Sequence, residues 1–96
     1  MERRSDSRQP LIKEVIISCD RVGLIKGLTR DVSYTGVYVD TGQFSLINRV
    51  KVDVSFVLKQ GRKTITQTIG ARVARVDKKG AGLQFDCPLE SSYLLM

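Results

Sequence analysis

The chain has 96 residues, enough for one domain that buries its own hydrophobic core. Hydrophobic residues make up 42% of it and charged residues 27%, which is typical of a soluble globular protein. No apolar run approaches the roughly 20 residues that span a bilayer, and the charged start is not followed by the apolar region of a secretory signal. We therefore expect a cytoplasmic protein that does not insert into membranes.

The residue types present argue against catalysis and against a metal site. The chain contains no histidine, which is the commonest general base, and its acidic residues are scattered along the sequence. Its two cysteines, Cys19 and Cys87, do not provide the four ligands of a structural zinc site, and we expect both to be small, buried, reduced thiols near strand ends. The formal net charge of +6 favours an anionic partner.

The first third of the chain predicts a basic arm followed by two strands. Residues 1–10 are polar and basic and are expected to form a flexible arm. A strand is predicted at about 12–19, where Val15, Ile17 and Cys19 share one face. After a turn, a second strand is predicted to run to about Arg30.

The next stretch, Asp31-Val-Ser33-Tyr-Thr-Gly36, is predicted to form a strand–turn–strand corner that leads into a short strand at 37–40. Asp31 and Ser33 would lie on the same side of an extended backbone. Gly36 permits a left-handed turn or the close approach of a ligand. A simple alternative is a hairpin turn whose polar side chains bond their own backbone.

The second half of the chain has the clearest alternation. Residues 50–58 place valines, a phenylalanine and a leucine at every second position, which predicts a half-buried strand. A hairpin turn is predicted at 60–63, with a returning strand at about 64–76 and a bulge at Gly70. After a turn at 77–80, a last strand is predicted over 81–85.

Two segments flank these strands. A loop precedes the alternating strand, and three of its apolar side chains are expected to plug one end of the core: Phe44, Leu46 and Ile47. Residues 88–96 are expected to form a short helical tail, because proline suits the first position of a helix. Many short strands separated by regular turns predict an all-β fold, a small six-stranded antiparallel (split) β-barrel. One domain is expected over residues 1–96, with the barrel at 11–87.

The arm and the corner each carry a motif. In the arm, Arg4 and Arg8 form Arg-x-x-x-Arg with Arg3 just before it, and the corner has the form Asp31-x-Ser33-x-x-Gly36. This pairing, ahead of a run of short strands, resembles the PilZ domain family over nearly the whole chain. PilZ domains are bacterial cytoplasmic receptors for the second messenger cyclic di-GMP.

The resemblance implies a nucleotide site shared by the arm and the corner. Arginine forks suit both the phosphates and the O6/N7 edges of the guanines, and Asp31 can accept hydrogen bonds from guanine N–H groups. Ser33 can bond a phosphate or an amide, and Arg3 is similar to the extra arginine of members that bind a stacked pair of ligands. The ligand-binding residues implied are Arg3, Arg4, Arg8, Asp31, Ser33 and Gly36.

The resemblance further implies that ligand binding orders the arm and that the ordered surface signals to a protein partner. Three alternatives stay open. The first is a protein-interaction module with the PilZ fold that does not bind the nucleotide. The second, a nucleic-acid-binding barrel, is disfavoured because few aromatic residues are present to stack on bases. The third, an enzyme on a flavin-type split barrel, lacks any visible catalytic group.

Overall fold

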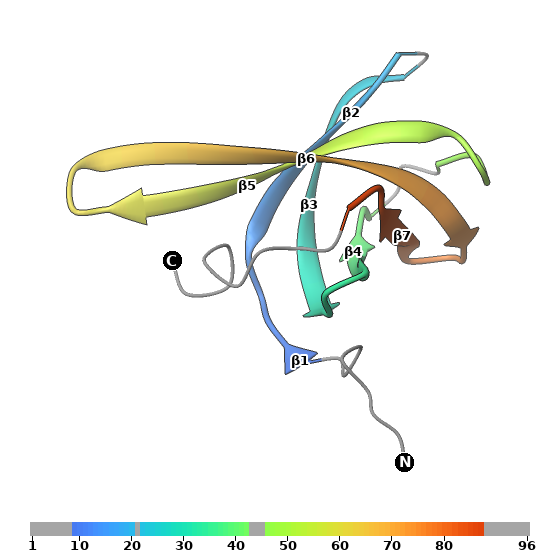
Figure 1. Cartoon of the computed structure of the whole chain (residues 1–96), viewed down its shortest axis with the longest axis horizontal. Helices are drawn as coiled ribbons and strands as arrows, with labels where there is room; N and C mark the ends of the chain where they lie inside the picture. The colour runs from blue at the N-terminus through green and yellow to red at the C-terminus, as the bar shows by residue number, and fades with distance from the viewer. Residues whose placement is uncertain (1–8, 21, 43–45, 88–96) are drawn as a thin grey trace.

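The computed structural model describes residues 9–20, 22–42 and 46–87. Within these ranges the chain forms seven antiparallel strands and no helix. The strands are β1 (Gln9–Pro10), β2 (Glu14–Cys19), β3 (Gly23–Val32), β4 (Gly36–Asp40), β5 (Lys51–Gln60), β6 (Lys63–Val76) and β7 (Gly80–Phe85). Figure 1 colours them in chain order from blue to red.

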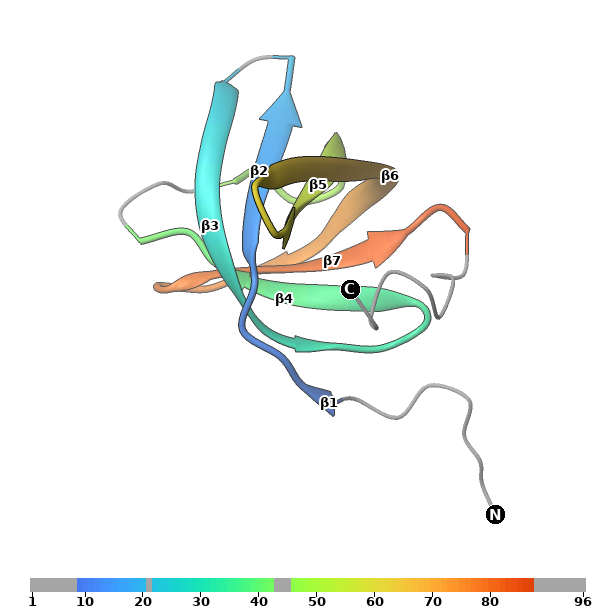
Figure 2. The same ribbon diagram turned by 90° about the vertical axis from the view of Figure 1, so that its left-hand side faces the viewer.

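Six of these strands close into a barrel, as the sequence predicts. Along the sheet the order is β3-β2-β5-β6-β7-β4, and a further pairing of β3 with β4 closes the ring. The strand β3 pairs with β2 along one edge and with β4 along the other, and its ladder with β4 shifts register between Thr29 and Asp31. Such a bulge bends a strand, which lets β3 leave β2 and cross to β4. Figure 2 shows β4 and β7 lying side by side in the wall that results.

The core is built from the alternating residues. The strand β5 buries every second side chain from Val52 to Leu58, and this confirms the strongest pattern in the sequence. Alternate residues of the other strands meet them inside the barrel, where burial of apolar area supplies the main driving force for folding. The largest fully buried side chains are Phe56, Ile17, Ile25, Leu58 and Leu83.

Outside the strands the sequence predictions are less accurate. Leu46 is buried as expected, but Ile47 is 57% exposed, so the prediction that it plugs the core is wrong. Phe44 lies outside the described residues. Cys19 is buried at the end of β2, whereas Cys87 is exposed, which contradicts the expectation for the second thiol. Cys87 follows the end of β7, so strand alternation no longer determines which side it faces.

The bulge predicted at Gly70 is also wrong. Gly70 pairs in regular register with Asp53 on β5, and β6 instead shifts register against β7 between Val73 and Arg75. Packing against a neighbouring side chain explains why position 70 is a glycine. A Cβ atom at Gly70 would lie 2.6 Å from a carboxylate oxygen of Asp86, so this position accommodates the neighbouring side chain.

The β5–β6 hairpin projects from the barrel (Figure 1). On one side, β2 pairs with β5 only as far as Phe56; on the other, β7 pairs with β6 only from Ala71 onward. The outer half of the hairpin is therefore a two-stranded ribbon. It closes at Gly61, whose φ of 61° lies in the left-handed region that glycine adopts readily.

At the other end of the chain, β1 pairs with β3 and contains the last two residues of the predicted arm. Gln9 lies opposite Val32, and Pro10 lies opposite Asp31. Between β1 and β2, the buried hydroxyl of Thr29 accepts the N–H of Lys13 at 2.8 Å and donates to the carbonyl of Leu11. The segment that enters the barrel is therefore hydrogen-bonded to β3. The predicted helix at 88–96 lies outside the described residues.

Candidate functional site

The corner predicted at 31–36 is shorter in the structure. The strand β3 continues through Asp31 to Val32, and the turn itself comprises Ser33, Tyr34 and Thr35. Asp31 is half-buried and pairs with Tyr38 of β4 on one side and with Pro10 of β1 on the other. The motif carboxylate thus lies on a paired strand, where the backbone is held on both sides.

Ser33 closes the turn with its side chain. It is 3% exposed, and its hydroxyl oxygen accepts the N–H of Thr35 at 3.3 Å and that of Gly36 at 3.2 Å. Its own N–H donates to the carbonyl of Gly36 at 2.8 Å. These are the bonds expected of a hydroxyl that stabilises a local turn. Ser33 therefore fixes the shape of the corner.

Gly36 is required by the packing of two strands. A Cβ atom at this position would lie 2.5 Å from the carbonyl oxygen of Leu83 on β7. No real Cβ approaches a backbone oxygen so closely, so any side chain would separate β4 from β7. This constraint acts on the barrel wall and is independent of any ligand.

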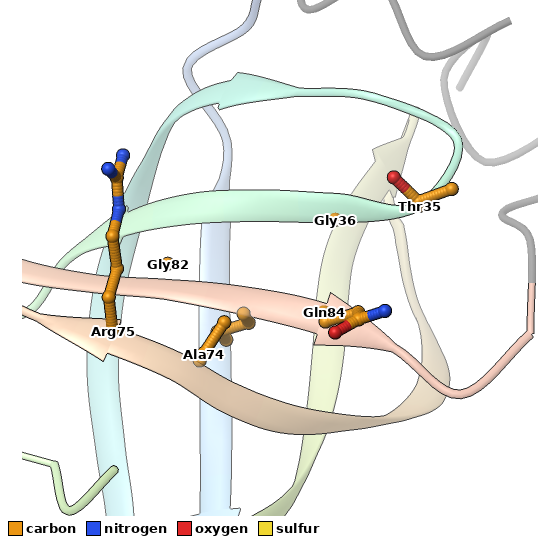
Figure 3. A pocket seen from close by; sticks show the side chains of 7 residues that line it. Thr35, Gly36, Ala74, Arg75, Gly82 and Gln84 are labelled. Atoms are coloured by element: carbon orange, nitrogen blue, oxygen red, sulfur yellow. The ribbon is translucent and has the colours of Figure 1, made fainter. Parts of the chain in front are cut away.

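A cross-strand row runs over the outer wall next to the turn. Asp31 of β3 pairs with Tyr38 of β4, Tyr38 pairs with Gly82 of β7, and Gly82 pairs with Arg75 of β6. We call these four residues the outer row. In Figure 3 the side chain of Arg75 extends across β7 at Gly82. A Cβ atom on Gly82 would lie 3.3 Å from Cγ and Nε of Arg75, so the missing side chain makes room for the guanidinium.

Two shallow hollows lie along the outer row. The hollow at the Arg75 end has a volume of about 230 Å³, is shown in Figure 3, and reaches Thr35 and Gly36 of the motif turn. The hollow at the Asp31 end has a volume of about 270 Å³ and is lined by Arg30, Asp31, Tyr38 and Lys79. Three cations border the wall beside the motif: Arg75 at one hollow, and Arg30 and Lys79 at the other. The carboxylate of Asp31 lines the second hollow as well, and Arg30 lies 3.9 Å from Asp40.

Tyr38 is held in place from the neighbouring turn. Its hydroxyl donates to Oδ1 of Asp77 at 2.7 Å, and the same oxygen accepts the N–H groups of Lys79 and Gly80 at 2.9 Å each. The hydrogen bond to Asp77 raises the pKa of Tyr38 to about 12. The same bond, with those from the backbone, lowers the pKa of Asp77. At neutral pH the phenol is therefore protonated and the carboxylate ionised.

The structure brings together Asp31, Ser33 and Gly36 at one end of the barrel wall. The other predicted residues, Arg3, Arg4 and Arg8, lie outside the described residues. Tyr34 occupies a position that the motif Asp31-x-Ser33-x-x-Gly36 leaves unspecified, and it is 43% exposed on the turn.

Sequence reasoning missed Tyr38, Lys79 and Arg75. Tyr38 was not predicted as a site residue because its sequence position indicates only an outward-facing residue of a short strand. Arg75 faces outward because β6 shifts register just before it, and no alternation rule predicts that shift.

Among the described residues, no helix is long and apolar enough to cross a membrane. The same part of the chain contains no group of three or more side chains suited to hold a metal ion.

Comparison with known proteins gives one family. The family model described as the PilZ domain matches residues 2–94. The structure is similar to the PilZ domain of CeSA from a cellulose-synthesizing bacterium, with a TM-score of 0.70, 18% identity, and coverage of 92% of this chain and 88% of that one. None of the curated protein sequences matches the chain.

A second solved structure is the inhibitor of motility (MotI/DgrA) of Bacillus subtilis. The TM-score is 0.74 with 18% identity, and the match covers 99% of this chain but 48% of that one. The chain therefore spans about half the length of this neighbour. At such identities the two solved structures establish the fold.

Proposed function

The chain belongs to the PilZ domain family, and we propose that it is a receptor that binds cyclic di-GMP on the outer wall and signals to a partner protein. PilZ domains are binding and adaptor domains, and our proposal assigns no catalytic step to this chain. The proposed site combines the six residues of the two motifs with the outer row.

The pairing of β1 with β3 is the observation that carries this proposal. Pro10 lies opposite Asp31, and Gln9 lies opposite Val32, the residue before Ser33. Arg8 directly precedes Gln9 in the chain. The arginine motif therefore ends at Arg8, one peptide bond before Gln9, which is paired next to the aspartate–serine motif. In sequence, 22 residues separate Arg8 from Asp31 (31 − 8 − 1). This proximity supports a single site built from both motifs.

The chemistry of the ligand fits this surface. Cyclic di-GMP carries two phosphates and two guanines, and arginine can bind a phosphate or the O6/N7 edge of a guanine through paired hydrogen bonds. We assign these contacts to Arg4 and Arg8. Arg75, which lies flat across Gly82, offers a guanidinium plane on which a guanine can stack. Lys79 and Arg30 add positive charge at the far end of the row.

The motif residues have distinct roles in this proposal. Asp31 accepts N–H groups of a guanine. Ser33 acts mainly by fixing the turn, since its oxygen already accepts two backbone N–H groups. Its hydroxyl hydrogen can still donate to a phosphate, because the carbonyl of Gly36 lies at a long 3.4 Å.

Signalling follows from ordering of the arm. Fixing the eight residues before β1 costs conformational entropy, roughly 1–2 kcal/mol for each residue whose backbone is fully restricted. The arginine contacts must exceed this cost, so we expect micromolar or tighter affinity, about −8 kcal/mol or better. The ordered arm then presents a new surface to a partner protein. One structural neighbour is named an inhibitor of motility, which is consistent with an adaptor role.

Calorimetric titration with cyclic di-GMP, beside GTP and cyclic GMP, tests the proposal. Selective binding is expected, and Arg8→Ala should abolish it without changing thermal unfolding. Arg62→Ala is the matched control, because Arg62 is an exposed arginine at the far tip of the hairpin. We expect Arg75→Ala to weaken binding by about tenfold, the value of one lost contact of roughly 1.4 kcal/mol.

Two further outcomes refine or replace the proposal. A stoichiometry of two ligands per chain would support a role for Arg3, and a ratio of one would argue against it. Absence of binding by the folded protein would favour the alternative, a PilZ-fold interaction module that does not bind the nucleotide. Full retention of affinity in Arg8→Ala would show that the site is assigned to the wrong residues.

A further inference from the structure

The outer half of β6 has a backbone edge with which no other described strand pairs. The carbonyl of Gly70 points away from β5 and accepts the N–H of Asp86 at 2.9 Å, whereas Val73 bonds Val50 and Arg49 on the β5 side. Backbone groups of successive strand residues point to alternate sides. Residues 64, 66 and 68 therefore direct their N–H and carbonyl groups to the same side as Gly70. Beyond Gly70, no described strand pairs with that side.

Three exposed threonines occupy this edge, namely Thr64, Thr66 and Thr68. The edge is bounded at both ends, because the hairpin turn lies beyond Lys63 and Asp86 occupies the position beside Gly70. Thr66 is thus close to its centre. An unpaired edge of β-branched residues is a ready template for another strand.

The edge is complementary to itself. If two copies pair antiparallel with Thr66 opposite Thr66, then Thr64 of each copy lies opposite Thr68 of the other. Each of the three threonines then exchanges both backbone hydrogen bonds across the two-fold axis. Cross-strand threonine pairs of this kind stabilise antiparallel ladders.

The charges at the two ends of the edge are also complementary. The tip carries Arg62 and Lys63, both exposed. The base carries two carboxylates next to Gly70: a Cβ there would lie 2.6 Å from Asp86 and 3.8 Å from Asp53. In the register centred on Thr66, the tip of one copy, with Arg62, reaches the base of the other, where Asp86 lies beside Gly70. The basic tip of each copy therefore meets the acidic base of its neighbour, even though Lys51 already bonds Asp86 at 2.7 Å.

From these observations we propose that the β6 edge is a self-association surface, on which a second copy of this chain pairs antiparallel to form one continuous sheet across a two-fold axis. The interface is isologous, as in most soluble dimers. It is a narrow ribbon contact, well below the roughly 1,200 Å² of a stable complex, so association is weak, with a dissociation constant in the micromolar range or above. The surface lies on the projecting hairpin and does not depend on nucleotide binding.

A nucleic acid is a poorer occupant of the same basic hairpin. Residues 57–69 contain no aromatic side chain on which a base can stack. A nucleic acid would also leave the row of edge N–H and carbonyl groups without strand partners.

Site-directed cross-linking tests the register. In a Cys87→Ser background, which removes the exposed thiol, Thr66→Cys should form a disulfide-linked dimer in a glutathione redox buffer. Directly opposed residues have Cα atoms about 5.5 Å apart, within the range of a disulfide. Thr64→Cys is the matched control: it lies on the same edge but should not link to itself, and it should link when mixed with Thr68→Cys.

Sedimentation equilibrium of the unmodified chain, over a concentration series reaching about 1 mM, tests the association itself. A monomer–dimer equilibrium is expected, and Thr66→Pro should abolish it. Proline removes an N–H that faces solvent in the monomer, so the hairpin and its thermal unfolding should be retained. Arg62→Glu should weaken association about tenfold.

Three results would overturn the proposal. They are a monomer throughout the concentration series, a dimer that persists in Thr66→Pro, and cross-linking of Thr66→Cys no faster than that of Thr64→Cys.

Discussion

The wall formed by β4 and β7 and the outer half of the β5–β6 hairpin are both antiparallel ladders, but they constrain their sequences differently. In the wall, glycines lie where a neighbouring backbone leaves no space: a Cβ at Gly80 would lie 1.9 Å from the carbonyl oxygen of Val39. At the hairpin tip, a Cβ at Gly61 would meet no atom within 4 Å. The wall glycine is required by its neighbours, and the tip glycine by its own backbone dihedral.

The two regions therefore differ in how well they should tolerate substitutions. The wall is held by barrel closure on both sides, and the proposed ligand meets it as a fixed surface. Among the described strands, the outer half of β5 and β6 pairs only with itself, so substitutions there should cost the barrel little stability. The proposed nucleotide site lies on the first region and the proposed contact with a second copy on the second.

Gly80→Ala against Gly61→Ala gives the largest expected contrast. Gly80→Ala should destabilise the protein by more than the roughly 1–3 kcal/mol typical of overpacking, because the atom it meets is backbone. Gly61→Ala should cost about 1 kcal/mol, the left-handed strain of one residue. Urea unfolding of both variants measures the difference. Similar costs would mean that the wall can separate β4 from β7 more easily than its geometry indicates.

Thr29→Val against Thr66→Val gives the second contrast. Thr29 is buried, and its hydroxyl joins Lys13 and Leu11, so valine removes a hydrogen bond from a partly buried N–H and another from a partly buried carbonyl. A cost of about 1–3 kcal/mol is expected. Thr66 is exposed on the ribbon, where valine should change stability by no more than about 0.5 kcal/mol. A neutral Thr29→Val would show that the entry to β2 is held by other contacts.

Tyr38→Phe gives the smallest contrast, and it depends on pH. The hydrogen bond to Asp77 raises the pKa of Tyr38 from its ordinary 10.0 to about 12, so its stabilisation is complete below pH 10 and lost as the pH rises through 12. The same bond lowers the pKa of Asp77 below its ordinary 3.8, so the stabilisation is also lost as the pH falls below that value. Between pH 4 and 10 it is constant.

Thermal unfolding of the two proteins across this pH range measures the bond. The difference between wild type and Tyr38→Phe should be flat in the middle and shrink at both extremes. A difference that persists at pH 2 would show that the Tyr38 hydroxyl stabilises the fold without an ionised Asp77, because phenylalanine retains the ring and lacks only the hydroxyl.

The sequence predicted the barrel because most strands obey a simple period. Every second residue from 50 to 58 is apolar, and β5 buries four of these five side chains: Val52, Val54, Phe56 and Leu58. The closure of six strands into a barrel was predicted from the number of short strands and from the family resemblance, whereas their order around the ring comes from the structure. The pattern failed at Ile47 and Cys87, which lie outside strands, where no repeat determines which side of the chain faces the core.

Only part of the candidate site could be predicted from the sequence. Asp31, Ser33 and Gly36 lie within one six-residue stretch of the chain, so a local motif identifies them. Arg75 joins them through a register shift in β6, and Lys79 through the turn before β7. Such neighbours come from the way strands close into a ring, which short-range patterns do not encode.

The pairing of Gln9 and Pro10 with β3 also determines the reach of the arginines. Arg4 lies five residues before Gln9 (9 − 4), so an extended chain carries it no more than roughly 18 Å from that anchor. Confinement on this scale gives tethered groups an effective concentration in the millimolar range. A free peptide of residues 1–8, added to a chain that lacks them, should therefore restore ligand binding only at millimolar concentration. Lengthening the segment between Arg4 and Arg8 by flexible residues should weaken binding gradually, as the dilution of a tethered group predicts.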